Sequence, residues 1–240
     1  MTLDEMIQSA KSGNAEMKRN VAQSIVWEDE TQPIDPYYLD IALDFLQDAI
    51  EAGDHEAMNT LGAMYYKGRG VRQDYAKSVE YYTKAAKEGN VFSMSNLGYV
   101  YYYGRNVKVD YEKAYYYFTK SALLGDRVST YKVGDMYMLG KYVEKDPMTA
   151  VKMYINLFNQ LSGKVETQDD EDVYSSVCLR IGRALHSGTG IHKDLIQAKF
   201  FLTEALDYYE TRLERGDTAA QSGYNKAQKE LNQIQGEMMN

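Results

Sequence analysis

The feature that most constrains the fold of this chain is an internal repeat with a period of 36 residues. Gly62 recurs as Gly98 and again as Gly134, each 36 residues after the one before. A fourth copy, at Gly182, follows after 48 residues, so about 12 residues are inserted ahead of it. A fixed period of this length is typical of repeat proteins, in which each unit buries its apolar face against its neighbours. The period therefore predicts one elongated array of paired helices.

Each repeat is expected to hold two helices, which we name the A helix and the B helix. The clearest A helix is predicted from about Glu56 to Lys67. Its inward residues recur at i, i+4, i+5 and i+8, the spacing of one helix face: Ala57, Leu61, Gly62 and Tyr65. Glycine inside a helix costs roughly 1 kcal/mol relative to alanine. Its recurrence at one position therefore predicts a close backbone approach between neighbouring helices.

The B helix is predicted from its cap and from a pattern of small, large and small residues. Gly68 is expected to end the A helix in a left-handed conformation, and Asp74 to cap the start of the B helix. The pattern at i, i+4 and i+7 is Ser78, Tyr82, Ala85 in one unit, Ala114, Phe118, Ser121 in the next, and Ala198, Leu202, Ala205 in the last.

The repeats predict a single solenoid domain over residues 1–240. Its segments are a degenerate repeat at 13–52, repeats at 53–88 and 89–124, a repeat at 125–172 with an acidic insert at 162–172, a repeat at 173–216 with a long second helix, and a C-terminal capping helix at 217–240. We expect the insert to be a surface loop because it is polar and acidic.

Composition excludes several functional classes. The net charge of −8 argues against general nucleic-acid binding, which needs basic surfaces. A single cysteine, Cys178, forms no internal disulfide and no metal cluster, which is typical of a reducing compartment. The sequence contains neither a signal-peptide pattern nor a long apolar run, so we expect no membrane segment and a cytoplasmic location.

Catalytic groupings are not recognisable in the sequence. His55, His186 and His192 lack metal-ligand spacing, and the glycine-rich GRG and GTG triplets coincide with the turns of the repeat. We therefore expect no enzyme activity, no cofactor and no metal. An enzyme with an unrecognised site is the alternative of another class.

The repeat unit resembles the Sel-one-like repeat (SLR) family, which is related to the tetratricopeptide repeats. The positions that carry the resemblance are Ala57, Leu61, Gly62, Tyr65, Gly68, Gly70, Val71, Asp74, Tyr82, Ala85, Ala86 and Gly89. The resemblance implies an all-α fold, an alpha-alpha solenoid in which helical hairpins form a right-handed superhelix. It also implies an interaction scaffold. Asn106 and Tyr142 replace the second loop glycine, so we expect those two loops to differ in shape.

In such solenoids the A helices line a concave groove, and the residues opposite their buried face are available to a partner. The candidates are Asn59, Tyr66, Phe92, Tyr99, Tyr102, Tyr103, Tyr131, Met138 and Arg183. Tyrosine suits a binding hot spot because it offers a large contact area and a hydroxyl group at a low entropic cost. The alternative is that these side chains pack between the A helices.

Two functions follow from this surface. The first is a non-enzymatic scaffold or adaptor that binds a protein or peptide in the groove. The second is a bacterial immunity or regulatory protein that neutralises one toxin or effector, with the acidic charge steering a basic partner. The sequence leaves the identity of the partner and the oligomeric state open.

Overall fold

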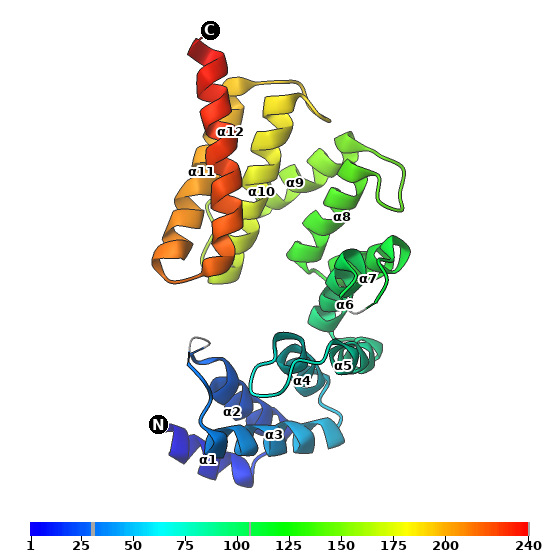
Figure 1. The fold of residues 1–240 in the computed structure, drawn as a ribbon, viewed down its shortest axis with the longest axis vertical. Coiled ribbons are helices and arrows are strands. Elements are labelled where there is room, and N and C mark those ends of the chain that lie inside the picture. The colour runs from blue at the N-terminus through cyan, green and yellow to red at the C-terminus, as the bar shows by residue number, and fades with distance from the viewer. Residues whose placement is uncertain (30–31, 106, 240) are drawn as a thin grey trace. The chain divides into compact units, whose positions relative to one another are not determined.

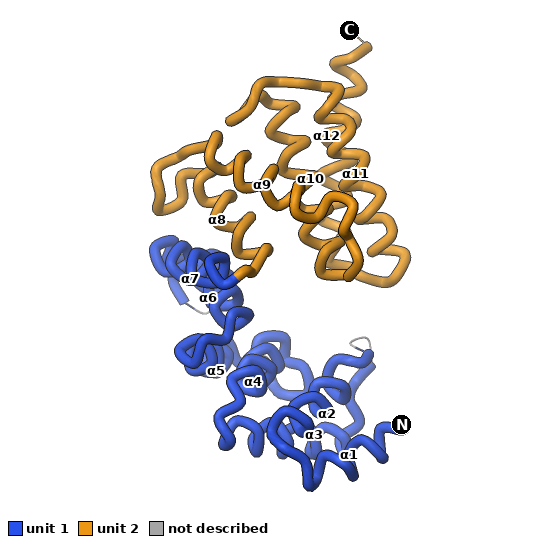
Figure 2. Tube along the Cα trace, turned by 180° about the vertical axis from the view of Figure 1, so that it is seen from behind, with its two compact units in different colours: residues 1–124 blue, residues 125–240 orange. Residues whose placement is uncertain are grey.

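The computed structural model describes residues 1–29, 32–105 and 107–239, and Asn106 lies outside these ranges. The described residues form two compact units that contain helices and no strand. Unit 1, Met1–Leu124, holds α1 (Leu3–Lys11), α2 (Ala15–Trp27), α3 (Pro36–Glu51), α4 (His55–Lys67), α5 (Tyr75–Lys87), α6 (Val91–Tyr103) and α7 (Tyr111–Leu123). Unit 2, Gly125–Asn240, holds α8 (Arg127–Leu139), α9 (Pro147–Leu161), α10 (Gln168–Ser187), α11 (Leu195–Glu214) and α12 (Gln221–Met239). Figure 1 labels the helices, and Figure 2 colours the two units.

Within each unit the helices pack as successive hairpins. In unit 1, α2 pairs with α3, α4 with α5, and α6 with α7, and in unit 2, α8 pairs with α9 and α10 with α11. A B helix also packs against the A helix that follows it in the same unit, as α5 does against α6 and α9 against α10. This succession confirms the predicted all-α class and the alpha-alpha solenoid.

The predicted caps set the ends of the helices. The B helices start after an aspartate whose carboxylate accepts hydrogen bonds from backbone N–H groups of the first turn: Asp74, Asp110, Asp146 and Asp194. The A helices of these repeats end at a left-handed glycine: Gly68, Gly104, Gly140 and Gly188. Since the caps satisfy backbone groups that a helix end leaves unpaired, they fix where each helix begins and which face it buries.

The repeated A-helix glycines lie under a large side chain from the B helix of the same hairpin. A Cβ atom added at Gly98 would lie 2.5 Å from Cδ1 of Phe118, whose side chain is fully buried. The equivalent pairs are Gly62 with Tyr82, Gly134 with Tyr154, and Gly182 with Leu202. The predicted close approach is confirmed, and the nearest atoms at each of these glycines belong to a side chain of the B helix.

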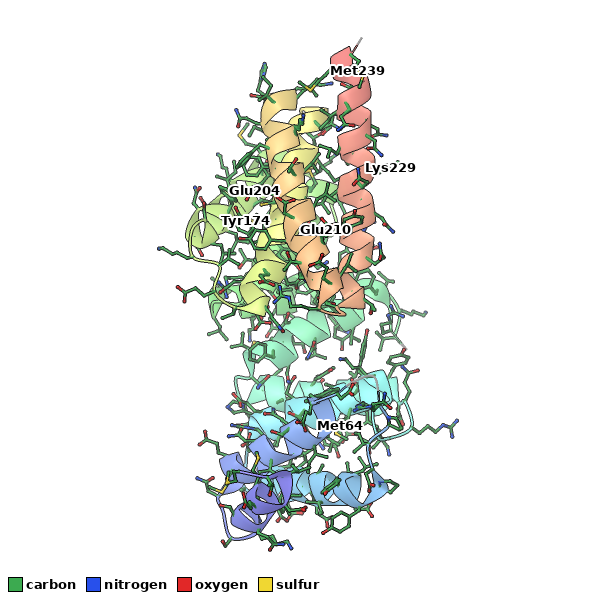
Figure 3. The ribbon with its side chains drawn as sticks, turned by 90° about the vertical axis from the view of Figure 1, so that its left-hand side faces the viewer. Met64, Tyr174, Glu204, Glu210, Lys229 and Met239 are labelled. Atoms are coloured by element: carbon green, nitrogen blue, oxygen red, sulfur yellow. The ribbon has the colours of Figure 1, made fainter. Side chains whose placement is uncertain are left out.

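The inward face of the A helix differs from the prediction at one position. Tyr65 was expected in the core, yet it is half-buried and stacks on Tyr81 with 5.8 Å between the ring centroids. The preceding residue, Met64, is fully buried instead (Figure 3). Met136 is buried in the same way ahead of the half-buried Tyr137.

The prediction that residues 162–172 form a surface loop is wrong for their second half. Helix α10 begins at Gln168, and Thr167 caps it in a capping box with Asp170. Asp169, Asp170 and Glu171 of the insert therefore lie in the first turn of α10, where the positive end of the helix dipole favours them. An acidic run that follows a threonine cap starts a helix here.

The prediction that Tyr142 changes the shape of its loop is also wrong. Tyr142 has a φ of 67°, which matches the 70° of Gly70 and the 75° of Gly190 at the equivalent positions. The loop thus keeps the left-handed turn of its siblings, and a bulky residue adopts a conformation that favours glycine.

The C-terminal helix α12 packs against α11 and α10. It buries Ala227, Leu231 and Ile234 on the side that faces these helices. One side of α12 is thereby docked on the last hairpin, which places its remaining side chains beside the residues of α10.

Candidate binding site

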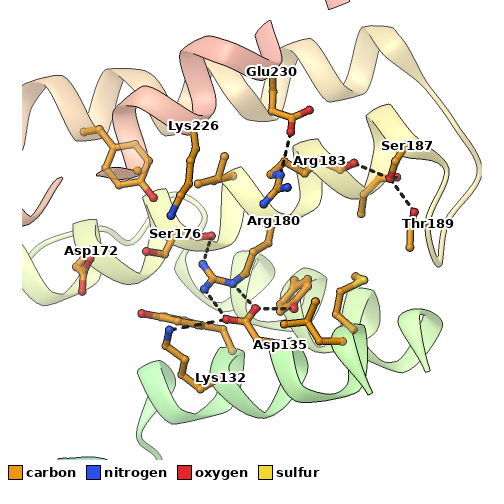
Figure 4. A pocket seen from close by; sticks show the side chains of 18 of the residues that line it. Lys132, Asp135, Asp172, Ser176, Arg180, Arg183, Ser187, Thr189, Lys226 and Glu230 are labelled. Atoms are coloured by element: carbon orange, nitrogen blue, oxygen red, sulfur yellow. Dashed lines mark hydrogen bonds and ion pairs between the residues drawn. The ribbon is translucent and has the colours of Figure 1, made fainter. Parts of the chain in front are cut away.

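Unit 2 contains a cleft of about 520 Å³ between α8, α10 and α12. Its charged lining includes Lys132, Asp135, Arg180, Arg183, Lys226 and Glu230 (Figure 4). Apolar and aromatic side chains from α8 and α10 complete the walls, among them Tyr131, Met138, Leu139 and Leu179. The A helices α8 and α10 supply most of the lining, and the B helices add Tyr154 from α9 and Tyr209 and Arg212 from α11.

Asp135 of α8 forms hydrogen bonds with α9 and α10 at the wall of the cleft. Arg180 donates to both of its carboxylate oxygens, with Nε at 2.6 Å from Oδ1 and Nη2 at 2.7 Å from Oδ2. The hydroxyl group of Tyr154 donates to Oδ1 at 2.8 Å. Burial raises the pKa of Asp135, but the charge and hydrogen bonds of Arg180 outweigh this effect and bring the pKa below its usual value. The guanidinium of Arg180 also lies 4.2 Å from the ring centroid of Tyr131, a cation–π contact.

Lys132 lies beside this pair with only 13% of its side chain exposed. Its Nζ is 3.9 Å from Oδ2 of Asp135. Burial lowers the pKa of Lys132 to about 8, the positive charges of Arg180 and Lys226 act in the same direction, and Asp135 opposes them. The carboxylate of Asp135 therefore faces both Arg180 and Lys132 on this wall. Burial makes the charged form of Lys132 less favourable than it is in water.

A second network connects α10 to α12. Arg183 donates from Nε to Oε1 of Glu230 at 3.0 Å. His186 lies between Glu230 and Glu237, with Nδ1 at 2.8 Å from the first and Nε2 at 2.9 Å from the second. Burial lowers the pKa of His186, but the hydrogen bonds to both glutamates outweigh it and raise the pKa above its usual value. Lys193 adds a contact of 2.8 Å to Glu237.

Arg212 on α11 closes one end of the cleft lining. Its Nη1 donates to Asp172 on α10 at 2.7 Å, and its Nη2 donates to Asp217 at 2.7 Å. These hydrogen bonds connect α11 to α10 and to the turn that precedes α12, and so fix the position of these segments at the end of the cleft.

The cleft carries a positive surplus within an acidic chain. Its lining has five cationic side chains against three carboxylates, whereas the whole chain has a net charge of −8. Lys226 of α12 is exposed, and in the part of the chain that the structure describes it has no ion-pair partner. Figure 4 shows its side chain pointing from α12 toward Ser176 of α10.

Three of the nine residues predicted from the sequence line this cleft: Tyr131, Met138 and Arg183. Tyr131 differs from the expectation of an open groove position, because it is only 5% exposed and lies under Arg180. Its ring therefore lines the cleft and also belongs to the hydrophobic core of unit 2.

The other six predicted residues lie in unit 1. Phe92 and Tyr103 on α6 are 62% and 52% exposed, and Tyr103 stacks on Tyr99 with 6.1 Å between the ring centroids. Tyr99 and Tyr102 pack against Phe118, which lies on the B helix α7 of the same hairpin. The last two residues make contacts within unit 1: Tyr66 meets the ring of Tyr75, and Asn59 accepts hydrogen bonds from Ser93 and Asn96.

Three residues of the cleft were not predicted from the sequence: Lys132, Arg180 and Lys226. The first two share a repeat position, two residues before the A-helix glycine, where the earlier units have Thr60 and Asn96. A change from neutral to cationic residues at one register of the repeat was the available signal. Lys226 had none, because α12 lies outside the periodic part of the sequence.

In the described ranges, no group of three or more histidine, cysteine, aspartate or glutamate side chains gathers as metal ligands. Within the same ranges, none of the helices has the length and apolar character needed to cross a membrane.

The hairpins and their caps define a helical repeat protein of the alpha-alpha solenoid class. The family model of the Sel1 repeat matches residues 55–90, 91–126, 128–156 and 175–207, which together make up more than half of the chain. The chain therefore belongs to the Sel1 repeat family, as the resemblance predicted. Among curated proteins, none matches the sequence.

Solved structures with the same fold include a Sel1 repeat protein from Oxalobacter formigenes. It is 21% identical, with a TM-score of 0.67, and the match covers 95% of this chain and 88% of that one. A protective antigen of uropathogenic Escherichia coli strains, which displays an SLR fold, is 24% identical with a TM-score of 0.58. That match covers 93% of this chain and 58% of the antigen, so the chain spans little more than half of its length. At these identities the likeness concerns the fold alone.

Proposed function

We propose that the chain is a non-enzymatic scaffold that binds a protein or peptide segment on the exposed side of its A helices. The observation that carries the proposal is the cleft of unit 2. Its volume of about 520 Å³ lies within the range of roughly 300–1,000 Å³ that is usual for ligand pockets. Aromatic, aliphatic and charged side chains all contribute to its lining, which suits the mixed side chains of a peptide. Sel1 repeat proteins are generally protein-interaction scaffolds, and this supports a protein partner.

An aromatic patch on α6 of unit 1 is a second contact surface in this proposal. Phe92 and Tyr103 expose more than half of their surface there, and Tyr102 lies 4.9 Å from Tyr103 between ring centroids. Exposed aromatic side chains held by neighbouring rings lose little further entropy on binding, so they suit an anchor position.

The proposal assigns no reaction to the cleft. Asp135, Arg183 and Glu230 are held in ion pairs that connect helices, with distances of 2.6–3.0 Å. Charged groups that are paired in this way hold the walls together and do not converge on a common reacting atom. The charge of the cleft lining also differs in sign from the acidic surface that the toxin-neutralising alternative relied on, so that alternative stays a prediction from the sequence.

Affinity capture from the native host tests the scaffold. The wild-type chain, a cleft variant and a matched control are used as baits, and bound proteins are identified by mass spectrometry. Leu139→Glu places a charge in the cleft lining at a residue that is 56% exposed, and Ile196→Glu makes the same kind of change on α11 at a residue that is 74% exposed. Both variants are therefore expected to fold.

We expect one set of proteins to bind the wild type and Ile196→Glu and to be lost with Leu139→Glu. The affinity of the purified partner should fall at least about tenfold, as for a hot-spot residue. Equal capture by all three baits would exclude the cleft as the docking site. Capture of no protein by any bait would overturn the scaffold itself.

A further inference from the structure

We infer that the contacts of His186 with α12 form a proton-dependent clamp, which closes the cleft of unit 2 around its peptide. This inference rests on the proposed function and names how the same site is regulated. It is carried by the place of α12 in the cleft wall and by the arrangement of the charged groups that fasten this helix to α10.

The first step is that α12 is a wall of the cleft. It contributes Gly223, Lys226 and Glu230 to the lining, whereas the residues across from it come mainly from α8 and α10. Figure 4 shows Glu230 reaching from α12 to Arg183 of α10. The width of the cleft therefore depends on how closely α12 is held against α10.

The second step is that the contacts that hold this wall converge on two glutamates. Glu230 and Glu237 lie seven residues apart on α12, which places them on one face of the helix. His186 lies between them, with Nδ1 at 2.8 Å from Glu230 and Nε2 at 2.9 Å from Glu237. Arg183 also pairs with Glu230, and Lys193 pairs with Glu237. We call these five residues the α12 clamp.

The third step is that this geometry suits only the protonated ring. A neutral imidazole has one N–H donor, so its other nitrogen would turn a lone pair toward a carboxylate. Only 11% of the His186 side chain and 19% of the Glu230 side chain are exposed, so water screens this repulsion weakly. Loss of the proton therefore removes one hydrogen bond of the α12 clamp and adds a repulsion between α10 and α12.

The fourth step is that the α12 clamp loosens as the pH rises. Burial lowers the pKa of His186, but the hydrogen bonds to both glutamates outweigh this effect and raise the pKa above the ordinary 6.5. The pKa of Glu237 is lowered, first by the hydrogen bond from Lys193 and then by that from His186, so Glu237 stays charged. The stabilisation of the docked α12 is therefore fully present below pH 6.5 and is lost as pH rises through the folded pKa of His186.

The other helices that line the cleft carry charged groups with partners of their own. On α8, Asp135 pairs with Arg180, and Lys132 contacts Asp135. On α11, Arg212 pairs with Asp172 of α10. Lys132 also titrates in this range, because burial lowers its pKa to about 8. An experiment on the α12 clamp therefore needs a comparison in which Lys132 is unchanged.

Hydrogen exchange of the whole chain tests the clamp without a partner. Exchange in the segment 221–239 is followed by mass spectrometry at pH 6.0 and pH 8.5 and is corrected for the intrinsic pH dependence of amide exchange. Protection in the wild type should be about fivefold lower at pH 8.5. His186→Gln should change little with pH, and His192→Gln, in an exposed loop, should follow the wild type.

Glu237→Gln is a second variant, at a side chain that is 44% exposed. It keeps a hydrogen-bonding group beside His186 but removes one negative charge, so it should reduce the pH dependence of exchange. It decides the question if His186→Gln loses its helical circular dichroism. Full wild-type pH dependence in Glu237→Gln would contradict the clamp.

Peptide affinity then tests the coupling of the clamp to the cleft. A random dodecapeptide library is selected against the whole chain at pH 6.0, and peptides that no longer bind Leu139→Glu are kept. Those without histidine or cysteine are synthesised with an acetylated N-terminus, so that the peptide itself does not titrate between the two pH values. Their affinity for the wild type should be at least about fivefold lower at pH 8.5 than at pH 6.0. His186→Gln should show a smaller change, and because it retains Lys132, the difference between the two proteins is due to His186.

Equal pH dependence of exchange in the wild type and His186→Gln would overturn this inference. An affinity that changes equally with pH for these two proteins would also overturn it. Both results leave the scaffold in place, since peptides still bind in the cleft. If no peptide is enriched, or if every recovered peptide binds Leu139→Glu as well as the wild type, the peptide-binding cleft fails and this inference fails with it.

Discussion

Asp135 on α8 and Arg180 on α10 form a two-pronged ion pair that joins the A helices of two successive hairpins in unit 2. The contacts of 2.6 and 2.7 Å use both carboxylate oxygens, and each side chain keeps about a fifth of its surface exposed. Removal of one member leaves the other charge largely out of water. Substitution of either residue should therefore lower the stability of the chain. Because both residues line the cleft, it also changes the cleft wall.

Asp135→Ala should lower the free energy of unfolding by roughly 2 kcal/mol. This is below the 3–5 kcal/mol that is typical when a fully buried pair is broken, because these side chains are partly exposed. The double variant Asp135→Ala with Arg180→Met should recover part of the loss, since the unpaired guanidinium is removed while Lys132 still loses its contact with Asp135. Urea denaturation of Asp135→Ala, Arg180→Met and the double variant measures this. Additive losses in the double variant would contradict the pairing.

Gly98→Ala should destabilise the chain although alanine is the better helix former. The new Cβ atom would lie 2.5 Å from the ring of Phe118, so the fully buried ring would have to move. We expect a loss of about 2 kcal/mol in urea denaturation, typical of overpacking. Gly236→Ala in α12 is the control, because no atom lies within 4 Å of its new Cβ. That variant should gain up to about 1 kcal/mol.

Tyr142→Gly should raise the free energy of unfolding by about 1 kcal/mol. Tyr142 has a φ of 67°, and release of this left-handed strain outweighs the greater entropy that glycine brings to the unfolded chain. Thermal denaturation checks the change. The opposite substitution, Gly190→Ala, should be destabilising, because its φ is 75° and a Cβ there would lie 2.3 Å from the carbonyl oxygen of Pro147. A neutral or harmful Tyr142→Gly would show that the side chain contributes more than its backbone costs.

Lys132→Met should be more stable than the wild type at pH 7, by roughly 1–2 kcal/mol. The pKa of Lys132 is about 8 in the folded chain against 10.5 for an unperturbed lysine, so the unfolded state binds more protons between these two pH values. The stability of the wild type therefore rises with pH from about 8 toward 10.5, and the advantage of the variant shrinks over this range. Parallel pH profiles for the two proteins would contradict the assignment.

His186 should produce a pH dependence of the opposite sign and in a lower range. Its pKa is raised in the folded chain above the ordinary 6.5, so its stabilisation is fully present below pH 6.5 and is lost as pH rises through the folded value. Both ring nitrogens face glutamates, which requires two N–H donors and thus the protonated ring. The Tm of the wild type should fall between pH 6 and pH 8.5 relative to His186→Gln. His192→Gln, in an exposed loop, should follow the wild type.

The period of the repeat was enough to predict the hairpins, because caps such as Asp110 and left-handed glycines such as Gly104 are local signals that act within a few residues. The cleft was harder to predict. Tyr131 and Arg183 were found because they lie on the expected A-helix face, whereas Lys226 belongs to a helix without the repeat pattern. Ion pairs such as Asp135 with Arg180 join residues 45 positions apart, and that partnership depends on how hairpins stack.

The glycine-to-ring contacts have an evolutionary consequence. In every matched pair the glycine and the large residue belong to one hairpin, as Gly98 and Phe118 do. This steric constraint is therefore contained within one hairpin, and duplication of a hairpin copies both of its members in a single event. Arrays of this kind can lengthen or shorten by whole hairpins. New specificities can arise at positions that already differ between the copies in this chain, such as Thr60, Asn96, Lys132 and Arg180, while the contact between glycine and large side chain stays unchanged.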